Sequence, residues 1–219
     1  MTFHRTAFYA VALCVSIAPG VAAQGAAKSI GFGVVGGAAF SKPAGEDAGG
    51  TDIGPFVNTY TAFAAGGFVR LGISRLFTIQ PELLYIQKGA KFLDDAGAPA
   101  GRLKVGYVQI PVLVQVRIPT GPAGFVSPHV YAGPAVGFKA GCKLREETGT
   151  GYTSCEDGGQ KLKGSDFSVV FGGGVDIGRA VIDVRYDYGF SKLEDISPPS
   201  NVKNRTLYLL AGWRFGHPK

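Results

Sequence analysis

The chain has 219 residues and a formal net charge of +6, with 46 % hydrophobic and 17 % charged residues, which excludes an intrinsically disordered chain. Glycine fills 34 positions, about twice its usual share, yet the collagen triplet repeat is absent. The length fits one domain, or two at most, and fifteen Phe, nine Tyr and a single Met favour β structure. We expect no transmembrane helix, because no run of about 20 apolar residues follows the N-terminal segment.

Residues 1–23 have the pattern of a cleaved secretory signal peptide. A cationic start at Arg5 is followed by an apolar stretch that ends in small residues. We therefore expect an exported mature domain over residues 24–219. Cys14 raises the alternative of a lipoprotein attachment site, but Leu13 before it is too large for that signal. The remaining charge is scattered, with no block of five like charges, which argues against nucleic acid as a partner.

From Ile30 onward the hydrophobic pattern alternates with a period of two, which is typical of β-strands. Apolar residues fill one face and charged residues or glycine the other over 182–190, and the same alternation recurs over 206–215, 77–86 and 108–118. Weaker, glycine-rich versions cover 30–41, 62–74, 125–140 and 165–178. We therefore expect eight strands of about 12 to 16 residues, longer than the roughly 5–6 residues of ordinary soluble sheets.

The predicted connections alternate in length along the chain. The long ones cover 42–61, 93–102, 141–164 and 192–203, and the short ones 75–76, 119–124 and 179–180. Long strands with long loops at one end are typical of bacterial outer-membrane barrels, since a closed sheet satisfies every backbone hydrogen bond in hydrocarbon. The sequence thus predicts an all-β, closed, antiparallel eight-stranded transmembrane β-barrel with an up-and-down meander, located in the cell outer membrane.

The two cysteines of the mature chain, Cys142 and Cys155, would reach an oxidising compartment after export. They lie in a polar stretch without the spacing of a CxxC redox site and without a nearby histidine to complete a zinc site. We predict a disulfide that closes a surface loop, with two free thiols as the alternative. We expect no metal site and no cofactor.

The polar faces of the predicted strands carry equal numbers of basic and acidic residues, which would point into the barrel. They are Arg70, Arg117, Arg185, Arg214, Glu82, Asp176, Asp183 and Asp187. Equal numbers favour ion pairs that plug the lumen, because unpaired charges in so narrow an interior would be costly. A narrow conducting path is the alternative. Asp183 and Asp187 also resemble paired catalytic carboxylates, but the intervening Arg185 favours ion pairing.

Catalysis has one further candidate in the sequence. Ser127 and His129 share a strand face and could form a nucleophile–base pair, but no acidic third group is apparent on a neighbouring strand. The glycine clusters do not open a helix after a strand, which excludes a phosphate-binding loop. We therefore expect no enzymatic activity, and a lipid-modifying outer-membrane enzyme is the minor alternative.

Several segments are typical of one family. They are a glycine-rich opening strand, Phe77–Tyr85 (FTIQPELLY), Tyr107–Val114 (YVQIPVLV), Val130–Val136 (VYAGPAV) and a final strand that ends in an aromatic residue. Over about residues 30–216 the chain resembles the porin-like outer-membrane β-barrel domain family, the small eight-stranded bacterial barrels. The resemblance implies assembly by the barrel insertion machinery, which would read the C-terminal strand through Leu209, Trp213 and Phe215.

That family is defined by architecture, so the resemblance leaves two functions open. The first is a structural or surface-interaction barrel with a plugged polar interior, which would display loops 42–61 and 141–164 to an extracellular ligand or host surface. The alternative is a small passive pore for small solutes or a hydrophobic ligand. The four predicted long loops contain 8 basic and 11 acidic residues, which argues against a strong polyanion-binding surface. We expect a monomer surrounded by outer-membrane lipids.

Overall fold

The computed structural model describes residues 29–46, 50–94, 96–118, 120, 125–146, 151–155, 157, 163–192 and 201–215. The predicted signal peptide, with Cys14, lies outside the described residues, so it stays a prediction. Within the described ranges, no helix is long and apolar enough to cross a membrane.

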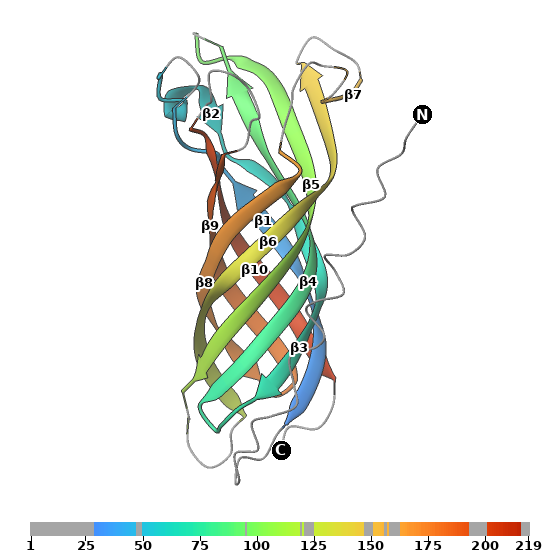
Figure 1. Cartoon of the computed structure of the whole chain (residues 1–219), viewed down its shortest axis with the longest axis vertical. Coiled ribbons are helices and arrows are strands. Elements are labelled where there is room, and N and C mark those ends of the chain that lie inside the picture. Colours follow the sequence, from blue (N-terminus) through green and yellow to red (C-terminus); the bar gives the residue numbers. More distant parts are fainter. Residues whose placement is uncertain are drawn as a thin grey trace, which may run out of the picture.

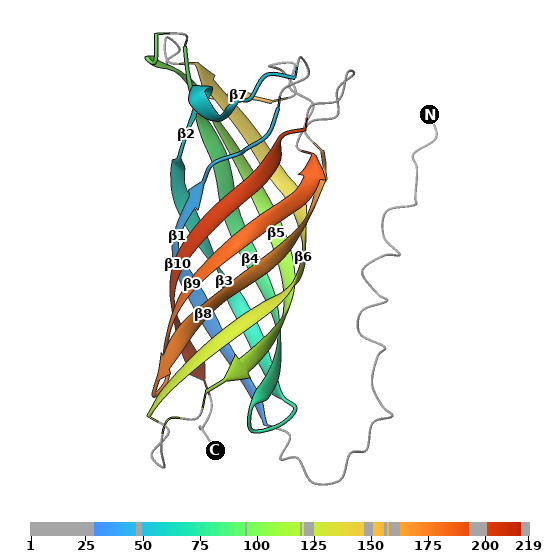
Figure 2. The ribbon, with the colours of Figure 1, turned by 90° about the vertical axis from the view of Figure 1, so that its left-hand side faces the viewer.

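Eight long strands of the described residues close into an antiparallel ring (Figures 1 and 2). They are β1 (Ile30–Ser41), β3 (Tyr60–Gly72), β4 (Phe77–Leu93), β5 (Pro99–Arg117), β6 (Val126–Glu146), β8 (Ser165–Ile177), β9 (Ala180–Lys192) and β10 (Lys203–Phe215). Each strand pairs with the strands next to it in sequence, and β1 pairs with β10 from Phe32↔Phe215 to Ser41↔Thr206. This last pairing removes both sheet edges, which confirms the predicted fold class.

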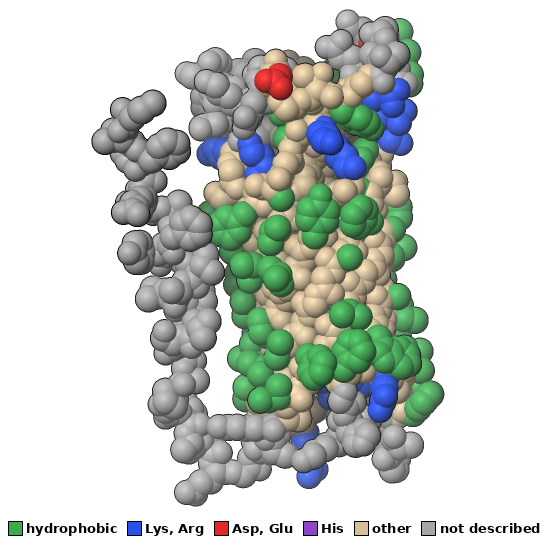
Figure 3. All heavy atoms as spheres, turned by 90° about the vertical axis from the view of Figure 1, so that its right-hand side faces the viewer, with side chains coloured by type: hydrophobic (Ala, Val, Ile, Leu, Met, Phe, Trp, Pro, Cys, Tyr) green, Lys and Arg blue, Asp and Glu red, His purple; other side chains and the backbone are tan. Residues whose placement is uncertain are grey.

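The alternation seen in the sequence separates an outer apolar face from an inner polar face. On β9, Ile182 and Val184 are 50 % and 48 % exposed, whereas Asp183 and Arg185 are 3 % and 2 % exposed. On β10 the outward side chains include Leu207 and the inward ones Tyr208, as predicted. On the face of the barrel that Figure 3 shows, hydrophobic side chains cover the wall, with Lys and Arg side chains towards both ends. This distribution matches an outer surface in contact with lipid.

Three strands are longer than the sequence pattern predicts. β4, β5 and β6 have 17, 19 and 21 residues and extend together beyond the rest of the ring, at the upper end in Figure 1. The connection expected over 93–102 is therefore a short one, from Asp94 to Ala98, and the loop expected from 141 starts only after Glu146. Charged and glycine residues hid the continuing alternation, but apolar inner pairs such as Leu103↔Leu144 maintain it.

Three short secondary-structure elements lie at this upper end. The segment predicted as loop 42–61 contains the 3-10 helix η2 (Gly54–Phe56) and β2 (Val57–Asn58), which pairs with β4. The segment predicted as loop 141–164 contains β7 (Thr153–Ser154), which pairs with β6. At the lower end the described connections are short turns, such as Gly178 and Arg179 between β8 and β9. Gly178 adopts φ 58°, a conformation that glycine provides without steric strain.

Apolar side chains fill part of the barrel interior. One cluster lies along β1, β3, β4, β9 and β10 and includes Val35, Phe68, Ile86 and Leu210. A second cluster, with Leu113 and Val170 among its members, lies on β5, β6 and β8. The remaining inner surface is polar and carries the candidate site.

Candidate functional site

All eight charged residues predicted to face the interior lie on inner positions of their strands. Six of them are at most 5 % exposed: Glu82, Asp176, Asp183, Asp187, Arg70 and Arg185. The other two, Arg117 and Arg214, are partly buried near the lower end. The structure therefore places these side chains on the face that the alternation assigns to the interior. The alternation does not predict which of the eight charged residues pair with one another.

Arg185 on β9 and Glu82 on β4 join opposite walls of the barrel. Three strands separate β4 from β9 in either direction around the ring, yet Nη1 of Arg185 donates to Oε2 of Glu82 at 2.6 Å. The two side chains are 1 % and 0 % exposed. Asp183 lies 3.3 Å from the second guanidinium nitrogen, and the ring of Tyr131 lies 5.3 Å from the guanidinium carbon. Side chains thus cross the lumen at this level.

A second pair also crosses the lumen, from β3 to β8. Nη1 of Arg70 lies 2.7 Å from Oδ2 of Asp176, and these strands are likewise opposite each other in the ring. Nε of Arg70 donates to Gln80 at 2.5 Å, and the amide nitrogen of Gln80 donates to Glu82 at 2.6 Å. Gln80 therefore links the two crossing pairs into one network. Arg214 approaches the same Asp176 oxygen at 3.8 Å.

A third set of contacts lies nearer the upper end and includes two charged residues that were not among the eight predicted to face the interior. Nζ of Lys88 on β4 lies 2.8 Å from Asp187 on β9 and 3.1 Å from Asp166 on β8. Gln109 donates to Asp187 at 2.9 Å, and Asn204 donates to Asp166 at 2.8 Å. The period-two alternation could have placed Lys88 and Asp166 inward, had it been extended further along these strands. Asp187 thus pairs with Lys88, not with Arg185.

His129 has an acidic partner, contrary to the expectation that no third group would lie near it. Nε2 of His129 on β6 lies 2.8 Å from Oδ1 of Asp183 on β9, and Nδ1 lies 3.9 Å from Asp176. Gly174 on β8 stands between His129 and Asp183 in the register. A Cβ atom there would come 2.0 Å from Asp183 Oδ1 and 2.9 Å from His129 Nε2. The missing side chain of Gly174 leaves the space for this contact, which sequence patterns do not reveal.

The buried histidine has no path to lipid in this arrangement. His129 is 2 % exposed and faces the lumen, where both ring nitrogens are directed at carboxylates. Ser127 is opposite Asp176 in the strand register and lies at the lower end of β6. Among the described residues, no group of three or more His, Cys, Asp or Glu side chains could hold a metal ion.

Some interior polar atoms of the described residues have no hydrogen-bond partner in the protein. Arg117 forms no ion pair within the described part of the chain, and its Nε atom has no hydrogen-bond partner. The same lack of a hydrogen-bond partner applies to both amide atoms of Gln115, the hydroxyl of Tyr131 and Nδ1 of His129. Buried groups of this kind are ordinarily hydrogen-bonded to water, so the lower interior has a capacity for water.

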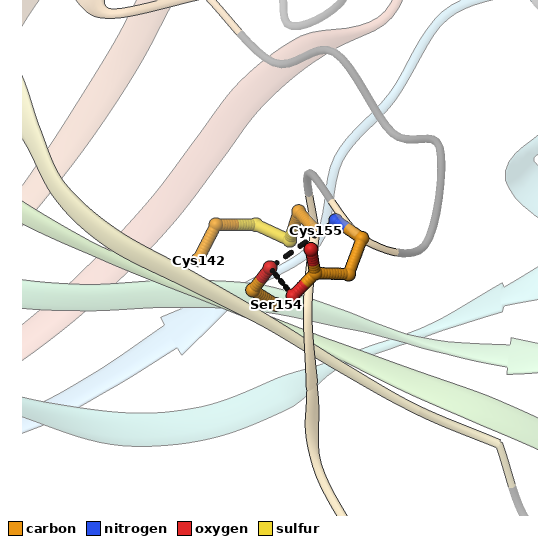
Figure 4. Close-up of a disulfide and its surroundings, with 4 residues drawn as sticks. Cys142, Ser154 and Cys155 are labelled. Carbon is orange, nitrogen blue, oxygen red and sulfur yellow. Dashed lines mark hydrogen bonds between the residues drawn. A yellow bond between two sulfur atoms is a disulfide. The ribbon is translucent and has the colours of Figure 1, made fainter.

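Cys142 and Cys155 form a disulfide, with their Cα atoms 5.4 Å apart (Figure 4). The bond does not close a loop that begins at residue 141, because Cys142 belongs to β6. It ties the segment that carries β7 to the inner face of the upper extension, where Cys155 packs with Val105 and Tyr107. Ser154, next to Cys155, donates its hydroxyl to Asp157 at 2.7 Å.

The three residues predicted to mark the C-terminal strand for assembly lie on the outer surface of the barrel. Leu209, Trp213 and Phe215 on β10 are 48 %, 47 % and 42 % exposed on the outer surface. The ring of Phe215 stacks on Phe32 of β1 with centroids 5.6 Å apart. These side chains therefore lie beside the seam where the first and last strands meet.

Comparison with known proteins agrees with this architecture. The model of the outer membrane protein β-barrel domain family matches residues 22–195. The chain belongs to this family. It is therefore an outer-membrane β-barrel protein, and the resemblance noted in the sequence is confirmed. The upper end, which has the longer connections, is the extracellular end in barrels of this kind.

Solved structures of small outer-membrane barrels are similar to this chain. OprG from Pseudomonas aeruginosa has 12 % identity and a TM-score of 0.52, over 88 % of this chain and 99 % of OprG. Ail from Yersinia pestis, solved with the heparin analogue sucrose octasulfate, has 21 % identity and a TM-score of 0.45, over 84 % and 99 % of the chains. Neisserial surface protein A has 14 % identity and a TM-score of 0.46, over 84 % and 97 %. No curated protein matches the sequence.

Proposed function

We propose that this protein is a structural and surface-interaction barrel whose interior is plugged by ion pairs and whose extracellular end presents a recognition surface. The observation that carries the proposal is the pair of salt bridges between opposite walls, Arg185–Glu82 and Arg70–Asp176. With Lys88 between Asp187 and Asp166 nearer the extracellular end, three levels of the lumen hold charged side chains. A barrel of eight strands is only wide enough for side chains to fill it.

The extracellular end supports a role in recognition. β4, β5 and β6 extend beyond the rest of the barrel, and the Cys142–Cys155 disulfide fixes the segment with β7 to this extension. Such a constraint lowers the conformational entropy that a loop loses when it binds a partner. The extracellular ligand or host surface proposed for residues 42–61 and 141–164 would therefore meet a partly ordered surface.

The remaining parts of the proposal concern biogenesis and chemistry. Residues 1–23 act as a cleaved signal peptide, the barrel insertion machinery recognises the strand that ends at Phe215, and the mature barrel is a monomer without enzymatic activity. The outward position of Trp213 and Phe215 beside the β1–β10 seam supports the assembly role. The absence of catalysis is supported by the burial of His129, which keeps its ring away from the lipid substrates such an enzyme would use.

Conductance across a planar lipid bilayer tests the plug. The folded wild-type protein, verified by its altered gel mobility before heating, should give negligible current, because ion pairs occupy the lumen. Arg185→Ala should also pass little current while being less stable. A steady, ion-selective conductance in the wild type that shifts with Arg185→Ala would replace the plug with a pore. A protein-free bilayer and a boiled sample serve as controls.

A small passive pore is the second candidate function, and one observation favours it. Arg117 and Gln115 line the lower interior with polar atoms that lack protein partners, so water has a place there. Continuous hydration would require a path past Arg185 and Lys88. The conductance experiment therefore decides between the two functions.

A further inference from the structure

The extracellular extension of β4, β5 and β6 carries a row of cations that the sequence does not bring together. In the strand register Arg102 on β5 is directly opposite Lys91 on β4 and Arg145 on β6. Two residues along β5, Lys104 is opposite Lys143 of β6. Directly opposed residues, and residues two apart on a strand, share one face of a sheet. All five cations therefore belong to the same face, which we name the basic face.

The basic face is the outer face of the extension. On β5 the even-numbered side chains Val112 and Ile110 point to the lipid, being 42 % and 37 % exposed, and Lys104 and Arg102 continue this series. The odd-numbered residues of the same segment, Val105 and Tyr107, pack inward around the disulfide. The basic face is therefore directed sideways, away from the barrel axis and towards the surrounding membrane.

Three of the five cations of the basic face have no carboxylate partner within the described part of the chain. Lys91, Lys104 and Lys143 form no ion pair there, and Arg145 lies against the ring of Tyr152 at 5.7 Å. Asp94, which follows β4, accepts hydrogen bonds from the backbone of its own turn, and Asp157 accepts one from the hydroxyl of Ser154, the residue opposite Lys143.

Like charges directly opposite each other on a sheet are destabilising unless an anion lies between them. The count of charges in the predicted long loops gave more acidic than basic residues. It did not reveal this arrangement, because it did not distinguish the two faces of the strands.

Two tyrosines mark the boundary between the apolar wall and the basic face. Tyr85 is 40 % exposed on the outer face of β4, and its hydroxyl lies 2.7 Å from the position of a Cβ atom on Gly106, between Val108 and Lys104. The ring of Tyr60 lies over Gly89 in the same way, at 2.9 Å. Tyrosines with one apolar and one polar end occur where hydrocarbon meets headgroups. Val108 is the register partner of Tyr85, and Lys104 lies four residues before it on β5, roughly 10 Å higher in a tilted strand.

We propose that the basic face binds the phosphate groups of glycolipid headgroups in the outer leaflet of the outer membrane. Its cations stand about 5 Å apart between strands and about 7 Å apart along them, which lets two or more contact a single phosphate. Lys and Arg side chains also reach down from above the hydrocarbon while their charge stays among headgroups. A soluble polyanion is the less suitable occupant, because the face is directed along the membrane and not towards the medium.

Binding of purified lipid A to the full-length protein in zwitterionic detergent micelles tests the proposal. Wild-type protein should bind bisphosphorylated lipid A. It should bind the dephosphorylated lipid no better than a variant without the lysines of the basic face. The triple variant Lys91→Gln/Lys104→Gln/Lys143→Gln should bind the bisphosphorylated lipid roughly 100-fold more weakly, from about five-fold for each cation near a charged lipid surface. Increasing salt should reduce the wild-type affinity and the difference between the two proteins.

A matched control variant removes the same charge from exposed positions elsewhere, with Lys42→Gln, Arg75→Gln and Arg179→Gln. It should bind lipid A as the wild type does, and heat-modified gel mobility should show that all three proteins are folded. Equal losses in the test and control variants would overturn the proposal, because net charge alone would explain them. Tighter binding of a soluble heparin oligosaccharide, or displacement of lipid A by inorganic phosphate at the same concentration, would overturn it too.

Discussion

Replacing Arg185 with alanine measures how much the ion pair across the lumen stabilises the barrel. The guanidinium is 1 % exposed and contacts Glu82 at 2.6 Å and 3.4 Å and Asp183 at 3.3 Å. Its removal leaves the buried Glu82 carboxylate without a cation, whereas Asp183 keeps His129 at 2.8 Å. Because breaking a buried ion pair from one side typically costs about 3–5 kcal/mol, we expect the free energy of unfolding to fall by that amount.

A second variant separates the pair from the packing around it. In Arg185→Leu/Glu82→Leu both charges are replaced by apolar side chains, and such replacements are often nearly neutral or stabilising. We expect this double variant to lie within about 2 kcal/mol of the wild type and to be more stable than Arg185→Leu alone. The change in the free energy of unfolding of the double variant, minus the sum of the changes in the two single variants Arg185→Leu and Glu82→Leu, is the coupling energy between the two side chains.

Unfolding by urea in detergent micelles, followed through tryptophan fluorescence, gives these free energies. Trp213 is the single tryptophan of the sequence and lies on the outer surface of β10, so its emission reports contact with the detergent. Arg75→Ala, on an exposed turn, is the control and should change stability by less than about 0.5 kcal/mol. A loss below about 1 kcal/mol for Arg185→Ala would refute the reasoning, as would additive losses in the double variant.

Three other changes test the fold and its assembly. Cys142→Ser should leave the heat-dependent gel mobility of the barrel unchanged while the segment with β7 becomes more sensitive to protease, since closing a loop of this size is worth about 3 kcal/mol locally; equal digestion of both proteins would contradict this. Gly174→Ala should lower the free energy of unfolding, because its Cβ would come 2.3 Å from a backbone oxygen, whereas Gly31→Ala, with nothing within 4 Å, should not. Phe215→Ala should slow insertion of the barrel in cells more than Phe190→Ala does, measured by the rate at which the heat-modifiable form appears; equal rates would remove Phe215 from the assembly signal.

The strands and their two faces could be predicted from the sequence because both are local properties. Side chains on a strand alternate between faces with a period of two, so the pattern over 182–190 places Asp183 and Arg185 opposite to Ile182 without knowledge of any other strand. Strand length and loop alternation then required a closed membrane barrel, because hydrocarbon offers no partner to an open sheet edge. The same local information placed all eight predicted charges on the inner face.

The pairing of these charges was decided only by the closed ring. Arg185 and Glu82 are 103 residues apart in sequence and lie on opposite walls, so their contact depends on the register of every strand pair between them. The contact of His129 with Asp183 depends further on an empty position at Gly174 on the strand between them. No period in the sequence encodes these distances, because the diameter and tilt of the barrel set them.

The extracellular end shows the same division. Lys91, Arg102 and Arg145 belong to three different strands, and in the sequence each is a charged residue in or near a predicted loop. Hydrogen bonding of β4, β5 and β6 beyond the rest of the barrel aligns them in one row and directs that row outward. The sequence by itself therefore determined which residues form strands and which face each occupies. The tertiary structure decided which side chains of different strands lie next to one another, because cross-strand register is a property of the whole closed sheet.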